Sequence, residues 1–320
     1  MILVTGATGF VGNAVVRCLL AEDASRRVVV AVRRNNQQWS ERVLPRVTGD
    51  LEPSADWSPA LEGVSAIVHC AARVHVMADT AADPLAEFRR VNVQGTLNLA
   101  RQAAAVGVRR FVFVSSVKVN GEATQLGRPF TADDAPAPLD ADGVSKMEAE
   151  QGLREIALET GMEVVIIRPP LVYGPGVKAN FAVMMRWLRR GIPLPLGAIH
   201  NQRSLVALDN LVDLIITCLT HPAAANQTFL VSDGEDLSTT QLLKRMGAAL
   251  GKPARLIPVP VSVLKLGAAL VGKPELAQRL CGSLQVDMSK TRELLGWTPP
   301  VSVDEGLKKA AKGYSRETAV

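Results

Sequence analysis

Short runs of apolar, β-branched residues alternate with longer stretches in which apolar residues recur every three or four positions. This alternation fills the first half of the chain and is typical of strands that alternate with amphipathic helices. Strands are expected at Ile2–Val4, Val28–Val32, Ala66–Val68, Phe111–Val114 and Val164–Ile167. Continuous apolar strands separated by helices predict a parallel sheet that is covered by helices on both faces. The predicted fold class is therefore α/β, with a doubly wound parallel sheet.

Helices are expected at Val11–Leu20, Pro84–Ala105 and Val144–Thr160. The second of these has Asp83 as its cap and proline as its first residue, where a missing N–H group costs nothing. Gly107 and Gly161 follow the second and third helices and are expected to end them.

After Ile167 the regular alternation gives way to turns rich in proline and glycine and to shorter helices. These helices are expected at Phe181–Arg190, Leu211–Thr220 and Thr239–Leu250. We expect a smaller mixed lobe over the carboxyl edge of the sheet. The predicted sheet domain covers residues 1–168, with returning segments near 204–232, and the lobe covers 169–203 and 233–320.

A glycine-rich turn connects the first strand to the first helix. Its glycines are Gly6, Gly9 and Gly12, and Phe10 and Val11 open the helix. Glycines permit a tight turn and a close approach of the backbone to a pyrophosphate, which the N–H groups of a helix N-terminus then bind. Because the pattern lies between a strand and a helix in a βαβ unit, it predicts a dinucleotide-binding domain.

The end of the second strand bears on the choice of dinucleotide. An NAD site normally has an Asp or Glu about twenty residues beyond the glycines, on the ribose hydroxyls. Here the strand ends in Arg33 and Arg34. Two guanidinium groups would suit a 2′-phosphate, so NADP(H) is favoured over NAD(H). The alternative is two solvated arginines beside an NAD that other groups hold.

Composition and charge narrow the function classes. The chain has 36 basic and 31 acidic residues, and the basic residues are scattered as doublets. Aromatic residues are only 4% of the chain, which argues against stacking on nucleic acid. No two of the four cysteines form a CxxC pair and the histidines are dispersed, so no metal site is expected. No targeting segment or membrane span is expected, so the predicted location is the cytoplasm.

Several further motifs follow the glycine turn in a fixed order. They are Gly49-Asp50-Leu51, His69-Cys70-Ala71-Ala72, Val91-Asn92-Val93-Gln94-Gly95-Thr96, Ser115-Ser116, Ser145-Lys146, the stretch from Arg168 to Gly176, Arg203, and Leu294-Leu295-Gly296-Trp297. Together they resemble the extended short-chain dehydrogenase/reductase family, in its nucleotide-sugar epimerase/dehydratase branch, over nearly the whole chain. The resemblance implies a Rossmann-type sheet with a substrate lobe. It also implies that Asp50 and Leu51 contact the adenine, that Ala71 and Ala72 line the cofactor, and that Pro169 approaches the nicotinamide.

The family's chemistry uses a Ser or Thr, and a Tyr four residues before a Lys. Residues at i and i+4 share a helix face, so the lysine can hold the nicotinamide ribose while its charge lowers the pKa of the tyrosine. The phenol exchanges a proton with the sugar oxygen, and the serine hydroxyl orients that oxygen. By resemblance, Ser116 is the serine, which also contacts substrate, and Lys146 is the lysine, which also contacts cofactor.

The tyrosine is missing, and Asp142 stands in its place. An aspartate is mostly ionised at neutral pH and is shorter than a tyrosine, so it is a poor proton donor. We expect it to pair with Lys146 at i+4. Three explanations stay open: a substitution foreign to the natural protein, a natural loss of activity, and a rerouted mechanism. The intact surrounding motifs favour the first, and loss of a general acid/base costs about 10² to 10⁴ in rate.

On the substrate side, the resemblance implies a nucleoside diphosphate sugar, carried by UDP or dTDP. Asn180 resembles the residue that holds its phosphate or sugar, and Arg203 resembles a diphosphate-binding arginine. A helix cap and a surface ion pair are the respective structural alternatives.

The sequence therefore predicts an NAD(P)-dependent oxidoreductase acting at C4 of a nucleoside diphosphate sugar, in surface polysaccharide biosynthesis. Reduction of a 4-keto-sugar is favoured because Arg33 and Arg34 suit NADPH. A 4-epimerase and a non-catalytic nucleotide-binding relative are the alternatives. The family resemblance also implies a homodimer.

Overall fold

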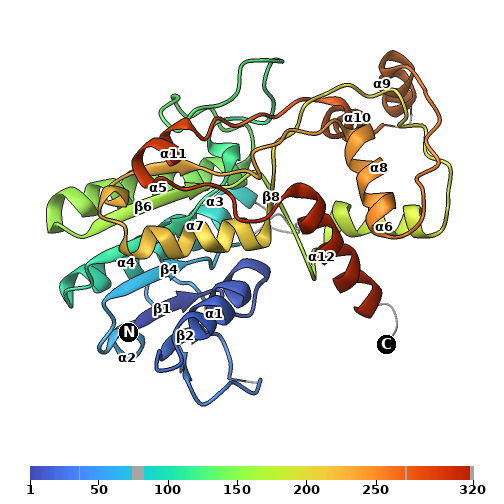
Figure 1. Ribbon diagram of the computed structural model, residues 1–320. Helices are drawn as coiled ribbons and strands as arrows, with labels where there is room; N and C mark the ends of the chain where they lie inside the picture. The colour runs from blue at the N-terminus through green and yellow to red at the C-terminus, as the bar shows by residue number, and fades with distance from the viewer. Residues whose placement is uncertain (36, 74–82, 271, 318–320) are drawn as a thin grey trace.

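A parallel sheet of seven strands forms the centre of the computed structural model, which describes residues 1–35, 37–73, 83–270 and 272–317 (Figure 1). The strand order is β3-β2-β1-β4-β5-β6-β9. The strands are β1 (Ile2–Thr5), β2 (Val28–Val32), β3 (Val43–Val47), β4 (Ala66–His69), β5 (Arg110–Val114), β6 (Glu163–Arg168) and β9 (Thr228–Leu230). The order reverses direction at β1, and the crevice at such a reversal is where doubly wound sheets bind ligands.

Helices cover both faces of the sheet, as the apolar strands require. One face carries α1 (Phe10–Glu22), α7 (Leu208–Thr220) and α11 (Ser289–Leu295). The opposite face carries α2 (Ser58–Leu61), α4 (Thr96–Ala105) and α5 (Ala141–Thr160). The Rossmann-type α/β prediction is confirmed.

The C-terminal lobe has its own apolar core, which contains Tyr173, Phe181 and Leu243. A second, two-stranded sheet of β7 (Leu171–Tyr173) and β8 (Leu205–Ala207) leads into it. The other elements of the chain are α3 (Pro84–Phe88), η1 (Arg89–Gly95), η2 (Val117–Val119), α6 (Ala179–Arg189), η3 (Pro222–Ala224), α8 (Thr239–Ala249), α9 (Val261–Leu270), α10 (Pro274–Cys281) and α12 (Val303–Glu317). Among the described residues, no helix is long and apolar enough to cross a membrane.

The helix predicted for Pro84–Ala105 is interrupted by a π-helical segment, η1. Asp83 caps its start, as predicted, by accepting a hydrogen bond from the Ala86 N–H group. Within η1, the Asn92 side chain donates to Ser145 on α5 and forms hydrogen bonds with both backbone groups of Arg73. The wider turn thus directs the polar side chain of Asn92 toward the carboxyl edge of the sheet. Single π-helical turns of this kind are frequent at functional sites.

Candidate active site

The glycine turn after β1 is shaped by contacts that leave no room for side chains. Gly6 has a φ of +66°, and a Cβ there would lie 2.8 Å from the backbone nitrogen of Ala71. A Cβ on Gly12 would lie 2.3 Å from the Gly6 carbonyl oxygen. Gly9 precedes α1 and provides no side-chain cap, so the first N–H groups of the helix have no partner within it. These features fit the pyrophosphate of a dinucleotide.

A buried hydrogen-bonded row joins the ends of β1 and β4 beside the turn. The Thr5 hydroxyl lies 2.7 Å from His69 Nδ1 and accepts a hydrogen bond from the Ala71 N–H group. His69 Nε2 lies 2.9 Å from the Thr96 hydroxyl on α4. Burial, together with the charge of Lys146, lowers the pKa of His69 to about 3, so the ring is neutral. The row fixes Ala71, and therefore the segment with Ala72, against the glycine turn.

The predicted adenosine contacts lie together at the ends of β2 and β3. Arg33 Nη1 is 3.7 Å from Asp50 Oδ1, and both side chains are largely exposed. Leu51 packs on η1, where a Cβ at Gly95 would lie 2.7 Å from the Leu51 carbonyl oxygen. Arg34 is exposed next to Arg33. Because the ion pair is exposed, it contributes little and leaves Arg33 able to meet an anion.

Ser116 and Pro169 are adjacent where β5 and β6 end. The Ser115 N–H group donates to the Ile167 carbonyl over 2.8 Å, and the Val117 N–H group donates to the Pro169 carbonyl over 3.0 Å. The Ser116 hydroxyl caps η2 by accepting a hydrogen bond from the Lys118 N–H group. The serine predicted to orient substrate therefore has a fixed backbone beside the proline predicted to meet the nicotinamide.

Lys146 extends from α5 to the end of β5. Its ammonium donates to the Val114 carbonyl over 3.0 Å and lies 4.7 Å above the Phe113 ring. Burial lowers the pKa of Lys146, while the negative charge of Asp142 acts in the opposite direction. A lysine held at this edge can reach the ribose of a nucleotide in the crevice.

The predicted ion pair between Asp142 and Lys146 is wrong. Asp142 Oδ2 is instead 3.0 Å from the ammonium of Lys118, which also binds Asp140 over 2.7 Å. The reason is that Lys146 is buried and bonded to Val114, while Asp142 lies in the first turn of α5, beside η2. Partial burial alone would lower the pKa of Lys118, but the bond to Asp140 and the charge of Asp142 outweigh it and raise that pKa.

A buried carboxylate that the sequence did not single out joins these elements. Glu150, one turn after Lys146, is fully buried and accepts a hydrogen bond of 2.6 Å from the Ser115 hydroxyl. It also binds the guanidinium of Arg168 through bonds of 2.9 and 2.6 Å. Arg168 in turn donates to the Asn120 side chain after η2. One network thus ties α5 to the residues directly before Ser116 and Pro169.

The predicted substrate residues lie in the C-terminal lobe. Arg203 Nη1 donates to the carbonyls of Arg279 and Gly282, over 3.0 and 3.2 Å. Burial lowers its pKa, and within the described part of the chain it forms no ion pair. An arginine without a carboxylate partner suits a diphosphate. Asn180 is the second residue of α6, and its side chain lies outside what the structure describes.

Residues 283–285 form backbone hydrogen bonds both to Ser204, which follows Arg203, and to the loop after η2. The Thr124 and Phe130 N–H groups donate to the carbonyls of Ser283 and Gln285, each over 2.9 Å. The Ser204 N–H group donates to the Leu284 carbonyl over 2.8 Å. The catalytic and substrate candidates thus lie on either side of this stretch. In the described ranges, no group of three or more His, Cys, Asp or Glu residues could hold a metal ion.

Comparison with known proteins gives the same family as these motifs. Residues 2–232 match the model of the NAD dependent epimerase/dehydratase family. A UDP-glucose 4-epimerase of Vibrio cholerae is 51% identical over 314 residues, which cover 98% of this chain and 95% of that protein. An N-acetyl-alpha-D-glucosaminyl-diphospho-ditrans,octacis-undecaprenol 4-epimerase of Escherichia coli O157:H7 is 26% identical, over 96% of this chain and 93% of that protein.

A similar solved structure is that of MoeE5 in complex with UDP-glucose and NAD. It has a TM-score of 0.77 and 25% identity, and the match covers 100% of this chain and 99% of that one.

The glycine turn gives the first prediction. Gly12→Ala places a Cβ against the Gly6 carbonyl, so we expect the turn to shift and NAD to bind at least tenfold more weakly. Gly267→Ala is the control, because a Cβ there meets no atom within 4 Å. Titration calorimetry measures both. Equal affinities for NAD in the two variants would contradict this view of the turn.

The hydrogen-bond network of Glu150 gives the second prediction. Glu150→Gln leaves the buried Arg168 without its counter-charge, so the free energy of unfolding should fall by about 3–5 kcal/mol. Glu155→Gln, on an exposed position of the same helix, should change it by less than about 0.5 kcal/mol. Chemical denaturation gives both values, and similar losses in both variants would refute the role given to Glu150.

Proposed function

The chain belongs to the NAD-dependent epimerase/dehydratase family, and on this premise we propose that its site is built for 4-epimerisation of a UDP-sugar. The observation that carries the proposal is the 51% identity, along nearly the whole chain, to a UDP-glucose 4-epimerase. A bound NAD would supply reversible acceptance of a hydride at C4.

The binding groups of such an enzyme are available at the carboxyl edge of the sheet and in the C-terminal lobe. The N–H groups at the start of α1 bind the pyrophosphate, and Lys146 positions the nicotinamide ribose. Arg203 balances the charge of the substrate diphosphate with a guanidinium that two backbone carbonyls already orient. Holding both partners in this way supplies much of the rate that an enzyme gains from orientation.

The site lacks the tyrosine that transfers the proton in this family. Ser116 supplies a hydroxyl that can hydrogen-bond the C4 oxygen. In place of a phenol, Asp142 presents a carboxylate that forms an ion pair with the Lys118 ammonium over 3.0 Å. This carboxylate is shorter than a phenol and is held on Lys118, so it is poorly placed to meet the C4 hydroxyl. We therefore propose that the chain binds its ligands and turns over slowly.

The substrate class follows from what the two named relatives share. One acts on a UDP-sugar and the other on a sugar diphosphate attached to undecaprenol, and both names specify inversion at C4. We propose a UDP-sugar because the relative that acts on it is about twice as similar in sequence. A role in surface polysaccharide synthesis is consistent with either substrate.

A second candidate, reduction of a 4-keto-sugar with NADPH, is favoured by one observation. Arg33 and Arg34 are both exposed at the end of β2, the place where a 2′-phosphate would lie. A third candidate, a protein that binds the nucleotides without chemistry, is favoured by the ion pair between Asp142 and Lys118.

The epimerase proposal is tested by Asp142→Tyr. We expect epimerisation of UDP-glucose to rise at least a hundredfold, because a phenol becomes available for proton exchange beside Ser116. Lys118 keeps Asp140 as a partner, so the substitution leaves no unpaired charge. A coupled assay of UDP-galactose formation measures the change.

The matched control is Asp142→Phe, which adds the ring without its hydroxyl. If Asp142→Tyr is no faster than Asp142→Phe, the epimerase proposal fails and the non-catalytic candidate leads.

The choice of cofactor is tested by the double variant Arg33→Ala/Arg34→Ala. Loss of charge-assisted bonds worth about 1.5–3 kcal/mol should weaken NADPH by about 10- to 150-fold and leave NADH nearly unchanged. Fluorescence titration measures both, with the exposed Arg17→Ala on α1 as control. Equal weakening of the two cofactors would remove the support for the ketoreductase candidate.

A further inference from the structure

Exposed apolar side chains are concentrated on one part of the C-terminal lobe. Fifteen large apolar residues are exposed in the described part of the chain, and five of them lie between residues 257 and 276. They are Ile257 (51% exposed), Val263 (55%), Leu266 (63%), Leu270 (79%) and Leu276 (47%). Clusters of this kind, unlike single exposed residues, mark interaction sites.

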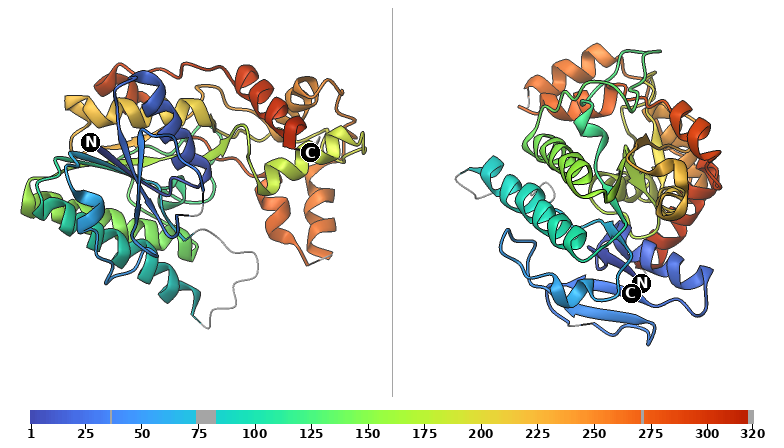
Figure 2. Two further views of the ribbon diagram at one scale, coloured as in Figure 1. Left: turned by 90° about the horizontal axis from the view of Figure 1, so that it is seen from below. Right: turned by 90° about the vertical axis from the view of Figure 1, so that its left-hand side faces the viewer.

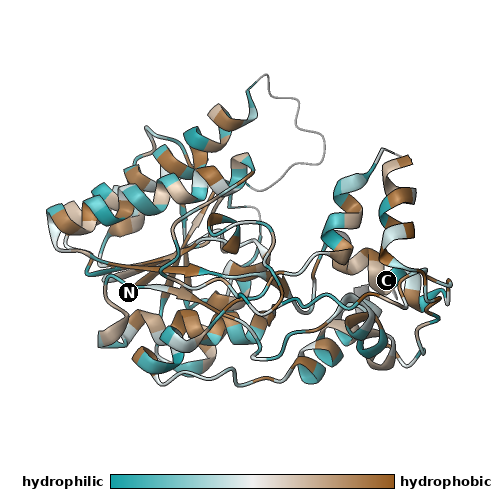
Figure 3. Cartoon of the chain, turned by 90° about the horizontal axis from the view of Figure 1, so that it is seen from above, coloured by the Kyte–Doolittle hydropathy of each residue, from teal (hydrophilic) through white to brown (hydrophobic). Residues whose placement is uncertain are grey.

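Four of them, all except Ile257, belong to a hairpin of α9 and α10, which pack against each other and project from the lobe (Figure 2). In Figure 3 the ribbon of one of the two helices of this hairpin is largely brown, so most of its residues are hydrophobic. None of the residues of α9 is buried. The hairpin thus extends from the lobe and lies mostly outside its apolar core.

Helix α9 is apolar on two opposite sides. Val261 and Leu264 pack against the core of the lobe. At 100° per residue, Val263, Leu266 and Leu270 fall within about 60° of one another, on the side away from that core. A surface helix normally has polar residues on that side. The outer side of α9 therefore has the composition of a covered surface.

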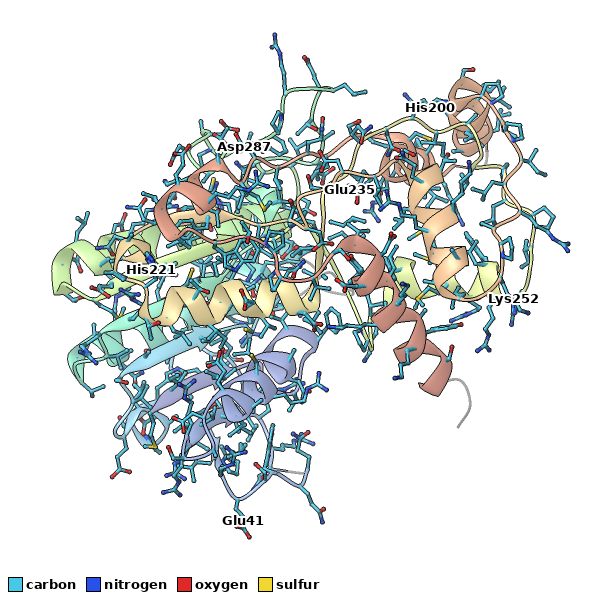
Figure 4. All side chains as sticks on the ribbon, viewed as in Figure 1. Glu41, His200, His221, Glu235, Lys252 and Asp287 are labelled. Atoms are coloured by element: carbon cyan, nitrogen blue, oxygen red, sulfur yellow. The ribbon has the colours of Figure 1, made fainter. Side chains whose placement is uncertain are left out.

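The segment that contains this hairpin is rich in basic residues. Residues 251–282 contain Lys252, Arg255, Lys265, Lys273 and Arg279 but only one acidic residue, Glu275. Their net charge is +4, out of +5 for the whole chain. In Figure 4, Lys252 lies at the end of the C-terminal lobe, far from Glu41 on the sheet domain. Most of the net positive charge of the chain thus belongs to the segment that contains these exposed apolar residues.

We propose that the α9–α10 hairpin docks on the surface of an anionic lipid bilayer. The side chains of Val263, Leu266 and Leu270 enter the boundary between headgroups and acyl chains, and the basic side chains bind lipid phosphates. A symmetric contact with a second copy would place two +4 segments face to face, which the charges oppose. An anionic bilayer matches both the apolar side and the charge.

Docking would bring the candidate diphosphate site close to the headgroups. Arg203 is bonded to the carbonyls of Arg279, on α10, and of Gly282, directly after it. The base of the hairpin thus carries the guanidinium that we assign to the substrate.

The test is sedimentation of the full chain with vesicles of equal parts phosphatidylglycerol and phosphatidylcholine, at low and at high salt. We expect binding at low salt, at least tenfold less binding to pure phosphatidylcholine, and weakening as salt rises. Leu266→Ser/Leu270→Ser and, separately, Lys265→Glu/Lys273→Glu should each reduce binding at least tenfold.

The controls are Leu158→Ser, at an 88% exposed leucine on α5, and Lys308→Glu on α12. Both should bind vesicles as the unaltered chain does, and circular dichroism should show that every variant is folded. The proposal is overturned if the unaltered chain stays in the supernatant with anionic vesicles, or if the controls lose as much binding as the hairpin variants. It is also overturned if the hairpin variants abolish self-association of the chain and leave vesicle binding unchanged.

Discussion

Three elements that bear the candidate site depend on one buried carboxylate. Glu150 has no contact with solvent, and its two oxygens bind the Ser115 hydroxyl and the Arg168 guanidinium. Ser115 comes directly before the residue expected to orient substrate, and Arg168 directly before the proline expected to meet the nicotinamide. A buried ion pair adds little net stability compared with apolar packing, but losing one partner is costly. Its effect here is to fix the position of α5, and so of Lys146, relative to the ends of β5 and β6.

With that frame in place, the distribution of charge decides what the site can do. Lys146 is buried and bonded to a carbonyl, which leaves Asp142 to the more exposed Lys118. The short helical turn η2 carries Lys118 and is capped by Ser116. Asp142 therefore contacts this turn and takes no part in the buried Glu150 network. The binding parts at the glycine turn and at Arg203 are built by residues that do not touch Asp142. A change at Asp142 is therefore expected to affect proton transfer without affecting ligand binding.

The sequence predicts the parallel sheet well because its five central strands are continuous apolar runs. The missed β3 contains Pro45 and Arg46, and a proline is tolerated there because β3 is at the edge of the sheet. The missed β9 has only three residues and pairs with β6 after a return of sixty residues along the chain. At the site, local spacing predicts a pair between Asp142 and Lys146, but the partner of each is set by elements that meet only in the folded chain. Local spacing places Glu150 only with Arg154, four residues further along α5. Its partners next to the site, Arg168 and Ser115, lie 18 and 35 residues away. The sequence signal for Lys118 is a single charge between Val117 and Val119, shortly after β5.

The proposed function rests on a nucleotide-sugar site that is intact except for its proton-transfer group. Its most direct test combines two measurements on the unaltered chain: calorimetric titration with NAD and UDP-glucose, and the absorbance of reduced nicotinamide after the two are mixed with the protein. We expect both ligands to bind, and reduced nicotinamide to form at least a hundredfold more slowly than in an epimerase with the tyrosine. Failure of NAD or UDP-glucose to bind would contradict the intact site, and rapid reduction of NAD would contradict the missing group.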